Sequence, residues 1–316
     1  MHQEQAPSAD VAVIGQAARD VVLQVEEFPP SGGSAGAVRL LEQLGGKGAN
    51  QAVGLAQLGL HPALLAVVGD DDDGARLLIQ ARIDGIDIHH IVRRPETRTA
   101  LFLDVVDRRG DRRLIEHVPE GTLLRKDDVA AASTLLTAVQ TVVIQLQQPA
   151  ETARAAAQVA RRAHRRVVLD GVPAEAAPRD DLLRMADVLR LDGQEANLLL
   201  GRPVDSAQAA LRAGRELLRC GPSLVALAAG QEANVLVWRG GEQVFPLIDA
   251  PVVDRTGAGD AYTAALTAVL TRDGSPAAAG QLASAAAASA VGRLGGRPDL
   301  RAAGLAGELH RLTSAG

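Results

Sequence analysis

The sequence predicts an α/β fold built on a mostly parallel sheet, and three observations support this prediction. Short runs of aliphatic and β-branched residues alternate with helix-like segments along most of the 316 residues. These runs are apolar throughout, as is typical of parallel strands that helices cover on both faces. Regions 21–44 and 99–118 instead alternate apolar and polar residues, which indicates a separate small sheet.

The buried strands and their helices follow one another in chain order. Six apolar runs are predicted to be strands: Val11–Gly15, Ala63–Gly69, Thr141–Leu146, Arg166–Asp170, Val188–Leu191 and Leu224–Gly230. Five segments between or after them are predicted to be helices: Ala49–Leu58, Ala75–Asp84, Glu151–His164, Asp180–Ala186 and Ser206–Arg219. Such alternation indicates repeated strand–helix units and therefore a layered domain.

Two hairpins interrupt this order. In region 99–118, the segments 101–106 and 112–118 flank a polar turn, and this predicts a hairpin. Because two strands alone are only marginally stable, we expect this hairpin to join region 21–44 in one small sheet that projects from the main body. A second hairpin is predicted over 234–239 and 243–248, with Gly240 and Gly241 in the turn.

Composition limits the classes of partner and compartment. The formal net charge of -5 argues against a nucleic-acid-binding surface. The single cysteine, Cys220, excludes an internal disulfide and a cysteine-rich zinc site, which fits a reducing compartment. No apolar run reaches the ~18 residues of a membrane span. Residues 1–10 lack the order of a signal peptide and are predicted to be a tail before a domain over 11–316. We expect a cytoplasmic protein.

The first motif with chemical content is Gly-Gly-Lys-Gly-Ala-Asn-Gln-Ala at 45–52. Its glycines let the backbone approach a ligand, and they precede a helix whose first amides favour anions or hydroxyl oxygens. Lys47 adds a positive charge, and Asn50 adds an amide that both donates and accepts. A glycine follows the lysine, so this is not a Walker A loop. Taken alone, the motif is equally consistent with a purely structural turn.

The second motif is Asp-Arg-Thr-Gly-Ala-Gly-Asp-Ala at 254–261, followed by an apolar helix to Leu270. At this junction of strand and helix, the amides of 257–260 and the helix dipole would form an anion hole for a phosphoryl group. Asp260 lies beside that hole and could accept the proton of a hydroxyl that attacks a γ-phosphate. The alternative, an acid that only favours the helix dipole, would require neither the glycines nor Asp254 and Thr256.

Together the two motifs resemble the ribokinase branch of the PfkB-type carbohydrate kinases, over about Val11–Gly296. Gly15, Asp20 and the segment 68–71 (Val-Gly-Asp-Asp) agree with the same pattern. The resemblance implies a ribokinase-like three-layer fold, with a central mostly parallel sheet flanked by helices and a small β-sheet lid at about 21–44 and 99–118. It also implies a sugar and ATP as ligands, Mg²⁺ with the ATP, K⁺ as an activator, and a possible homodimer through the lid.

The resemblance also implies roles for individual residues. The sugar site would comprise Asp20, Gly46, Lys47, Asn50 and Gln147. Asp260 would be the base, and the transferring phosphoryl group would be held by the amides of Gly257, Ala258 and Gly259. The nucleotide site would comprise Asp192, Glu195, Ala228 and Gly230, with Glu195 organising Mg²⁺ through water. Oxygen ligands for K⁺ would come from Asp254 and Thr256.

Four residues depart from the family pattern. Ala18 replaces a sugar-binding asparagine and Gln147 replaces a glutamate that faces the sugar, whereas Asp192 replaces an asparagine and Ala228 a threonine near the nucleotide. Losing a buried hydrogen-bond partner can change substrate preference by ~1–3 kcal/mol. The resemblance as a whole implies ATP-dependent phosphorylation of a primary hydroxyl on a pentose, with ribose the first candidate. A nucleoside, fructose or sugar-acid kinase of the same fold, or a ligand sensor that has lost catalysis, remains an alternative.

Overall fold

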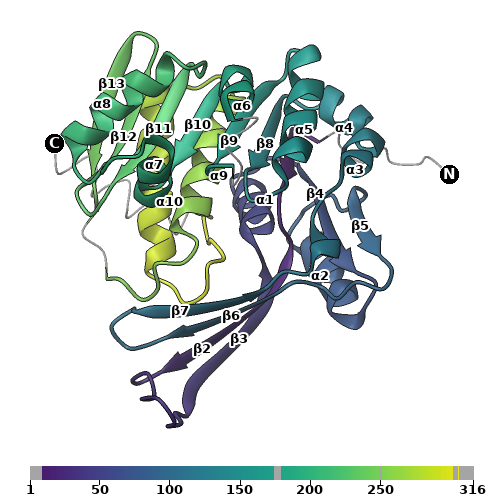
Figure 1. Cartoon of the computed structure of the whole chain (residues 1–316). Coiled ribbons are helices and arrows are strands. Elements are labelled where there is room, and N and C mark those ends of the chain that lie inside the picture. Colours follow the sequence, from purple (N-terminus) through teal and green to yellow (C-terminus); the bar gives the residue numbers. More distant parts are fainter. Residues whose placement is uncertain (1–8, 174–178, 249–250, 302–304, 306–316) are drawn as a thin grey trace.

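The computed structural model describes residues 9–173, 179–248, 251–301 and 305, so most of the predicted tail at 1–10 lies outside the described residues. A large sheet lies between two layers of helices, and a small sheet projects from one end of this body (Figure 1). This arrangement confirms the predicted α/β fold with a separate small sheet. None of the described helices is long and apolar enough to cross a membrane.

Within the described residues, the large sheet has nine strands in the order β13-β12-β11-β10-β9-β8-β1-β4-β5. Their bounds are β1 Val11–Ile14, β4 Pro62–Gly69, β5 Ile91–Arg94, β8 Thr141–Gln145, β9 Arg166–Asp170, β10 Val188–Leu191, β11 Leu224–Ala229, β12 Ala233–Trp238 and β13 Gly241–Pro246. Pairing is parallel from β5 to β11 and antiparallel at β12 and β13. The carboxyl ends of the parallel strands therefore meet at one edge, where ligands bind in open α/β sheets.

Helices cover both faces of the large sheet. One face packs against α1 Lys47–Gln57, α2 Asp72–Ile83, α9 Ala258–Thr271 and α10 Pro276–Val291. The other packs against α3 Lys126–Ala131, α4 Ser133–Ala138, α5 Ala150–Arg162, α6 Arg179–Met185, α7 Gly193–Leu200 and α8 Ala207–Leu218. In β1, Val11 and Val13 enter the first core while Ala12 and Ile14 enter the second. Because both faces are buried, the strand is apolar throughout.

The small sheet has the strand order β3-β2-β6-β7. Its strands are β2 Ala18–Val25, β3 Ala37–Gly45, β6 Leu101–Val106 and β7 Arg112–His117. The parallel pairing of β2 with β6 joins two segments that are far apart in the sequence, as expected for regions 21–44 and 99–118. One face of this sheet lies over the carboxyl edge of the large sheet, and this position brings it to the cavity described below.

Several predicted boundaries were wrong for identifiable reasons. Helix α1 begins at Lys47 rather than Ala49, so the first motif enters the helix itself. Helix α2 begins at Asp72 rather than Ala75, because the Asp71 side chain caps it by accepting the Gly74 amide at 2.8 Å. In the second hairpin, Gly241 already pairs with Trp238, so the turn lies one residue earlier than predicted. Helix α10 was not predicted, since its alanine-rich sequence has no polar face that would reveal a helical period.

Candidate active site

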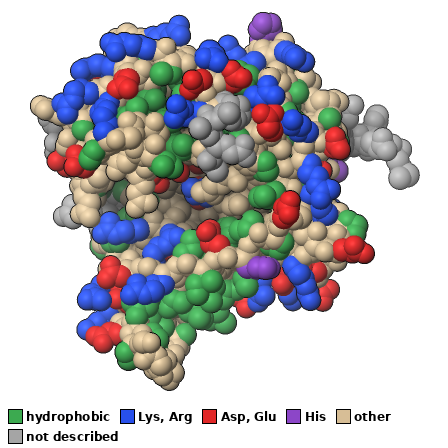
Figure 2. All heavy atoms as spheres, viewed as in Figure 1, with side chains coloured by type: hydrophobic (Ala, Val, Ile, Leu, Met, Phe, Trp, Pro, Cys, Tyr) green, Lys and Arg blue, Asp and Glu red, His purple; other side chains and the backbone are tan. Residues whose placement is uncertain are grey.

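A cavity of about 320 Å³ lies between the small sheet and the helical body. The surface is hollowed between these two parts (Figure 2). Eight of the predicted site residues line this cavity: Asp20, Gly46, Lys47, Asn50, Gln147, Thr256, Gly257 and Asp260. The remaining lining residues are Gln16, Val22, Phe102, Asp104, Arg112, Leu114, Glu116 and Gly296. The structure therefore brings together the two glycine-containing motifs, about 200 residues apart in sequence.

The N-terminus of α9 borders this cavity, and its conformation explains the glycines there. Gly257 precedes the helix at φ 77°, and a Cβ atom at this position would collide with the backbone of Gly296. A Cβ atom at Gly259 would lie 2.5 Å from Nη2 of Arg190. The first amides of a helix have no partner within the helix and carry its positive dipole end. This end of α9 is therefore suited to bind an anion.

Asp260 lies in the first turn of α9 and is 6% exposed. Its Oδ2 accepts a hydrogen bond from Asn50 Nδ2 at 3.2 Å, and its Oδ1 accepts one from Gln51 Nε2 at 3.1 Å. Burial raises the pKa of Asp260 to about 6; the charge of Lys47 opposes the rise and that of Asp170 adds to it. A carboxylate with a pKa near neutrality is suited to act as a general base.

A buried polar network extends behind Asp260. Gln51 Nε2 also donates to Asp170 Oδ2 at 2.7 Å, and Arg190 Nη1 donates to Asp170 Oδ1 at 3.2 Å. Glu195 lies 3.7 Å from the same Nη1 and 3.5 Å from Lys47 Nζ. Burial alone would lower the pKa of Lys47, but the neighbouring carboxylates, with Asp170 first, raise it above its ordinary value. Lys47 therefore stays charged beside the cavity.

The sequence analysis assigned no role to Gln51, Asp170 or Arg190. For Asp170, the signal was its place at the carboxyl end of a predicted parallel strand, the edge where sites of α/β folds lie. For Arg190, it was a charged residue inside a strand predicted to be buried on both faces. Gln51 lies in the first motif itself, yet only its contacts distinguish it from its neighbours.

Asp192 and Glu195 form the N-terminal cap of α7. Asp192 Oδ1 accepts the Glu195 amide at 2.8 Å, and Glu195 Oε2 accepts the Asp192 amide at 2.8 Å. Aspartate and asparagine cap helices about equally well, so Asp192 can serve as the cap where the resemblance implies an asparagine. Burial raises the pKa of Glu195, while Arg190 opposes the rise. Neither residue lines this cavity or the second cavity described below.

The donors present accommodate Mg²⁺ only as part of a complex with the nucleotide. Among the residues that the structure describes, no group of three or more His, Cys, Asp or Glu side chains could hold a metal ion. Mg²⁺ commonly keeps several waters and binds through one or two carboxylates together with substrate phosphates. Glu195, whose side chain is 17% exposed, fits the role of such a carboxylate acting through water.

Acidic and basic side chains of the small sheet contact Thr256, in the loop before α9, on the other side of the cavity. Burial, with Asp260 and then Asp104 as nearby charges, raises the pKa of Asp20 to about 7. Asp104 Oδ2 accepts from Thr256 Oγ1 at 3.0 Å, and Arg112 Nη1 donates to the same Oγ1 at 2.8 Å. The sequence analysis assigned no role to Asp104 or Arg112, because an alternating hairpin gives no hint of which body loop it will contact.

The predicted K⁺ ligands fit that role only in part. Asp254 Oδ1 accepts the Thr256 amide and Oδ2 accepts the Gly295 amide, each at 2.9 Å, which leaves further lone pairs on both oxygens. The Thr256 hydroxyl already donates to Asp104, and the Arg112 guanidinium bound to it would repel a cation. The Thr256 side chain is therefore not a suitable K⁺ ligand, and we assign no step to K⁺.

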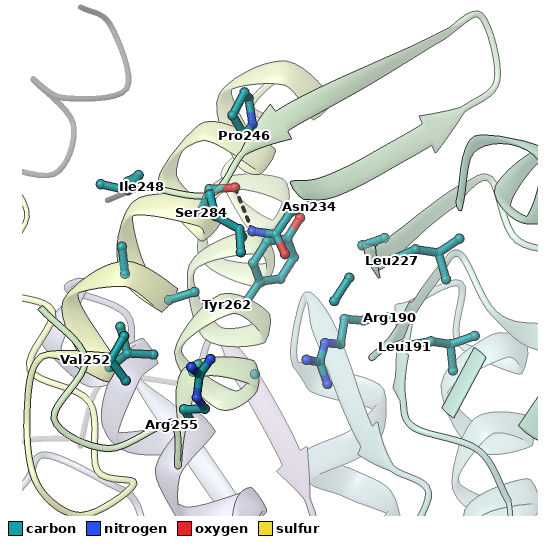
Figure 3. A pocket seen from close by; sticks show the side chains of 18 residues that line it. Arg190, Leu191, Leu227, Asn234, Pro246, Ile248, Val252, Arg255, Tyr262 and Ser284 are labelled. Carbon is teal, nitrogen blue, oxygen red and sulfur yellow. Dashed lines mark hydrogen bonds between the residues drawn. The ribbon is translucent and has the colours of Figure 1, made fainter. Parts of the chain in front are cut away.

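A second cavity of about 240 Å³ lies on the other side of the α9 N-terminus (Figure 3). Its lining is mostly apolar, with Arg190 and Arg255 at one end (Figure 3) and with Ala258 and Gly259 also among the lining residues. At the far end, Asn234 Nδ2 donates to Ser284 Oγ at 3.3 Å. Both cavities therefore adjoin one helix terminus.

Two of the predicted nucleotide residues lie at or near the second cavity. Ala228 is part of its lining. Gly230 is not; it occupies the turn after β11 at φ 57°, where a Cβ would lie 2.9 Å from the carbonyl of Asp205. The sequence analysis did not identify the apolar residues of this cavity, because they resemble ordinary core residues in composition.

Comparisons with known proteins show the family and the fold of the chain. The family described as "pfkB family carbohydrate kinase" matches residues 8–303, a range that includes both cavities. The ribokinase of Haemophilus influenzae is 26% identical over 290 residues, which cover 92% of this chain and 94% of that protein. The bifunctional ribokinase/ribose-5-phosphate isomerase A of Fructilactobacillus sanfranciscensis is 25% identical over 83% of this chain, which spans about half (49%) of that protein. The solved ribokinase of Thermotoga maritima has a TM-score of 0.78 and 25% identity, over 97% of this chain and 99% of that one.

Proposed function

Because the chain belongs to the pfkB family of carbohydrate kinases, we propose that it uses ATP to phosphorylate a primary hydroxyl of a pentose, with ribose as the first candidate. The family fixes the class of enzyme, a phosphotransferase that acts on a sugar. The proposed transfer between two ligands rests on one observation above all: the two cavities meet at the N-terminus of α9. ATP in the apolar cavity and a sugar in the polar one would place the γ-phosphate and the acceptor hydroxyl at the same amides.

In the proposed reaction the acceptor oxygen attacks the γ-phosphorus while the bond from that phosphorus to the β–γ bridging oxygen breaks. The hydroxyl proton passes to Asp260, which is ionised above its pKa of about 6, and ADP leaves. The amides of Gly257, Ala258 and Gly259 stabilise the charge that develops on the phosphoryl oxygens. Mg²⁺ bound with the nucleotide near Glu195 would neutralise phosphate charge.

The polar cavity favours a ligand rich in hydroxyl groups. Asp20 Oδ1 and Asn50 Oδ1 are buried acceptors with no hydrogen-bond partner among the described residues. Gln147 Oε1 already accepts from Gln145 Nε2 at 2.6 Å, which leaves the Gln147 amide group to donate. Sugar hydroxyls can satisfy groups of both kinds. Four carboxyl side chains but only two cationic ones, Lys47 and Arg112, line this cavity, and this acidic excess favours a neutral sugar over a sugar acid.

We also propose that the enzyme works in the cytoplasm as a homodimer joined through the small sheet. Hydrophobic side chains gather on this sheet (Figure 2), and Val38, Leu40 and Ile115 are 60%, 58% and 63% exposed. Exposed apolar patches of this kind often mark protein interfaces. Sedimentation equilibrium of the wild type and of Leu40→Asp tests the proposal: a dimer that the substitution dissociates supports it, and a monomeric wild type contradicts it.

Coupled ADP release tests the proposed reaction. Wild type and Asp260→Asn would be assayed with ATP, Mg²⁺ and K⁺ on pentoses, other sugars, nucleosides and sugar acids. We expect turnover on a pentose, and a loss of about 10²-fold or more in Asp260→Asn with the fold intact. Undiminished turnover in Asp260→Asn would exclude the mechanism. Turnover confined to nucleosides or sugar acids would exclude the pentose, and sugar binding without any turnover would favour the sensor.

A further inference from the structure

Arg190 is a charged residue in a position that the fold otherwise reserves for apolar side chains. It lies in β10 between Leu189 and Leu191, and the whole residue is only 9% exposed. Burying a guanidinium in a sheet covered on both faces is costly unless the charge is paired. A paired charge of this kind can often be replaced by apolar residues without loss of stability, so its presence calls for a specific role.

Two carboxylates hold the Arg190 side chain on one side. Its Nη1 donates to Asp170 Oδ1 at 3.2 Å and lies 3.7 Å from Glu195 Oε2. Burial alone would lower the pKa of Arg190, but Asp170 and Glu195 raise it, so the guanidinium remains charged. Asp170 also accepts a hydrogen bond from Gln51, which donates to Asp260. One carboxylate therefore fixes the guanidinium relative to the carboxylate of Asp260.

The other side of the guanidinium faces the first turn of α9. Nη2 lies so near Gly259 that a Cβ there would come within 2.5 Å of it. The side chain extends from its strand into the apolar cavity, toward the helix that carries Tyr262 (Figure 3). A guanidinium beside a helix N-terminus brings two sources of positive potential together, an arrangement that favours an anion of high charge.

We propose that Arg190 is a catalytic residue, whose guanidinium contacts the phosphoryl group as it moves from ATP to the acceptor hydroxyl at the α9 N-terminus. This inference rests on the proposed function. The bond that forms joins the acceptor oxygen to the γ-phosphorus, and the bond that breaks joins this phosphorus to the bridging oxygen of ADP. The acceptor proton goes to Asp260. Arg190 exchanges no proton and stabilises the charge on the equatorial oxygens.

A purely structural ion pair would behave differently, so the test needs a matched control. Arg94 pairs with Asp128 at 2.7 Å, its side chain is 11% exposed, and it lines neither cavity. Arg190→Gln and Arg94→Gln each remove a guanidinium from a mostly buried carboxylate. A structural role for Arg190 predicts similar results for both variants, namely reduced thermal stability with kcat little changed.

The experiment measures kcat, the sugar KM and the dissociation constants of ATP and adenosine for wild type and both variants. We expect Arg190→Gln to lower kcat by ~10²–10³-fold and to weaken binding of ATP but not of adenosine, with the sugar KM within about 3-fold of wild type. Arg94→Gln should keep wild-type kcat and nucleotide binding. An Arg190→Gln kcat within about 3-fold of wild type, or equal weakening of ATP and adenosine binding, would overturn the inference.

Arg190→Lys keeps the inference testable if Arg190→Gln does not fold. A single ammonium cannot bind Asp170 and a phosphoryl oxygen in the geometry of a guanidinium, so we expect at least about 10-fold lower kcat. Wild-type kcat in Arg190→Lys would refute the catalytic role. A wild type that turns over no compound of the panel would refute the proposed function instead, whereas the comparison of ATP with adenosine still tests Arg190 by itself.

Discussion

Gln51→Leu should move the acidic limb of the pH–rate profile upward. Gln51 Nε2 donates to Asp260 Oδ1 at 3.1 Å and is one of the groups that hold the pKa of Asp260 down to about 6. A hydrogen bond to a charged group is worth about 1.5–3 kcal/mol, and the long distance favours the lower figure. Since one pKa unit corresponds to about 1.4 kcal/mol, loss of this bond should raise the pKa of Asp260 to about 7. The ionised fraction at pH 6 would then fall from about one half to about one eleventh.

The assay is kcat from pH 5 to 9 at saturating ATP and sugar, so that any effect of Asp20 ionisation on sugar binding changes KM and not kcat. We expect Gln51→Leu to be about fivefold slower than wild type at pH 6 and nearly equal to it at pH 8. Gln57→Leu is the control, because Gln57 lies on the same helix but bonds to Pro298 outside the cavities. A rate loss of the same size at pH 6 and pH 8, or an unchanged acidic limb, would refute the role of Asp260 as base.

Two further substitutions test the backbone and the charges of the site. Gly257→Ala should lower kcat by about 10²-fold, because φ 77° and the collision with Gly296 would displace the anion-binding amides; Gly201→Ala, at φ 65° in open space, should cost only about 1–2 kcal/mol of stability. Asp20→Asn should raise the free energy of unfolding by up to about 4 kcal/mol at pH 8 and by less than about 2 kcal/mol at pH 5. The raised pKa of Asp20 means that the folded state binds more protons than the unfolded state between about pH 4 and 7, so wild-type stability falls as pH rises. Denaturant unfolding at both pH values measures this, and an equal effect at pH 5 and pH 8 would contradict it.

The fold and the center of the site could be predicted because their signals are local. An apolar run such as Val11–Ile14 indicates a strand buried on both faces. A glycine before a helix, such as Gly257, indicates a backbone conformation that other residues avoid. Asp260 lies three residues after such a glycine, Gly257, and therefore in the first turn of the helix, so its place beside the amides could be predicted from sequence alone.

The remaining site residues depend on packing between distant segments. Asp104 and Thr256 are 152 residues apart in sequence, and their contact exists only because β6 is placed over the loop before α9. Asp170 and Arg190 face each other because β9 and β10 pair in parallel with Asp170 opposite Arg190. No local pattern encodes such a pairing, although a charge inside an apolar strand was a detectable sign.

In the proposed mechanism, the arrangement separates phosphoryl transfer from the choice of substrate. Asp170 contacts Gln51 with one oxygen and Arg190 with the other, so Asp260 and the positive charge beside the anion hole are held by one buried group. Side chains locked in this way need little reorganisation during reaction. Part of the polar cavity's wall, where the sugar is proposed to bind, comes from other elements, namely β2, β6 and β7 of the small sheet. On this proposal, a departure such as Gln147, which contacts Gln145, can change which sugar fits without disturbing the groups assigned to phosphoryl transfer.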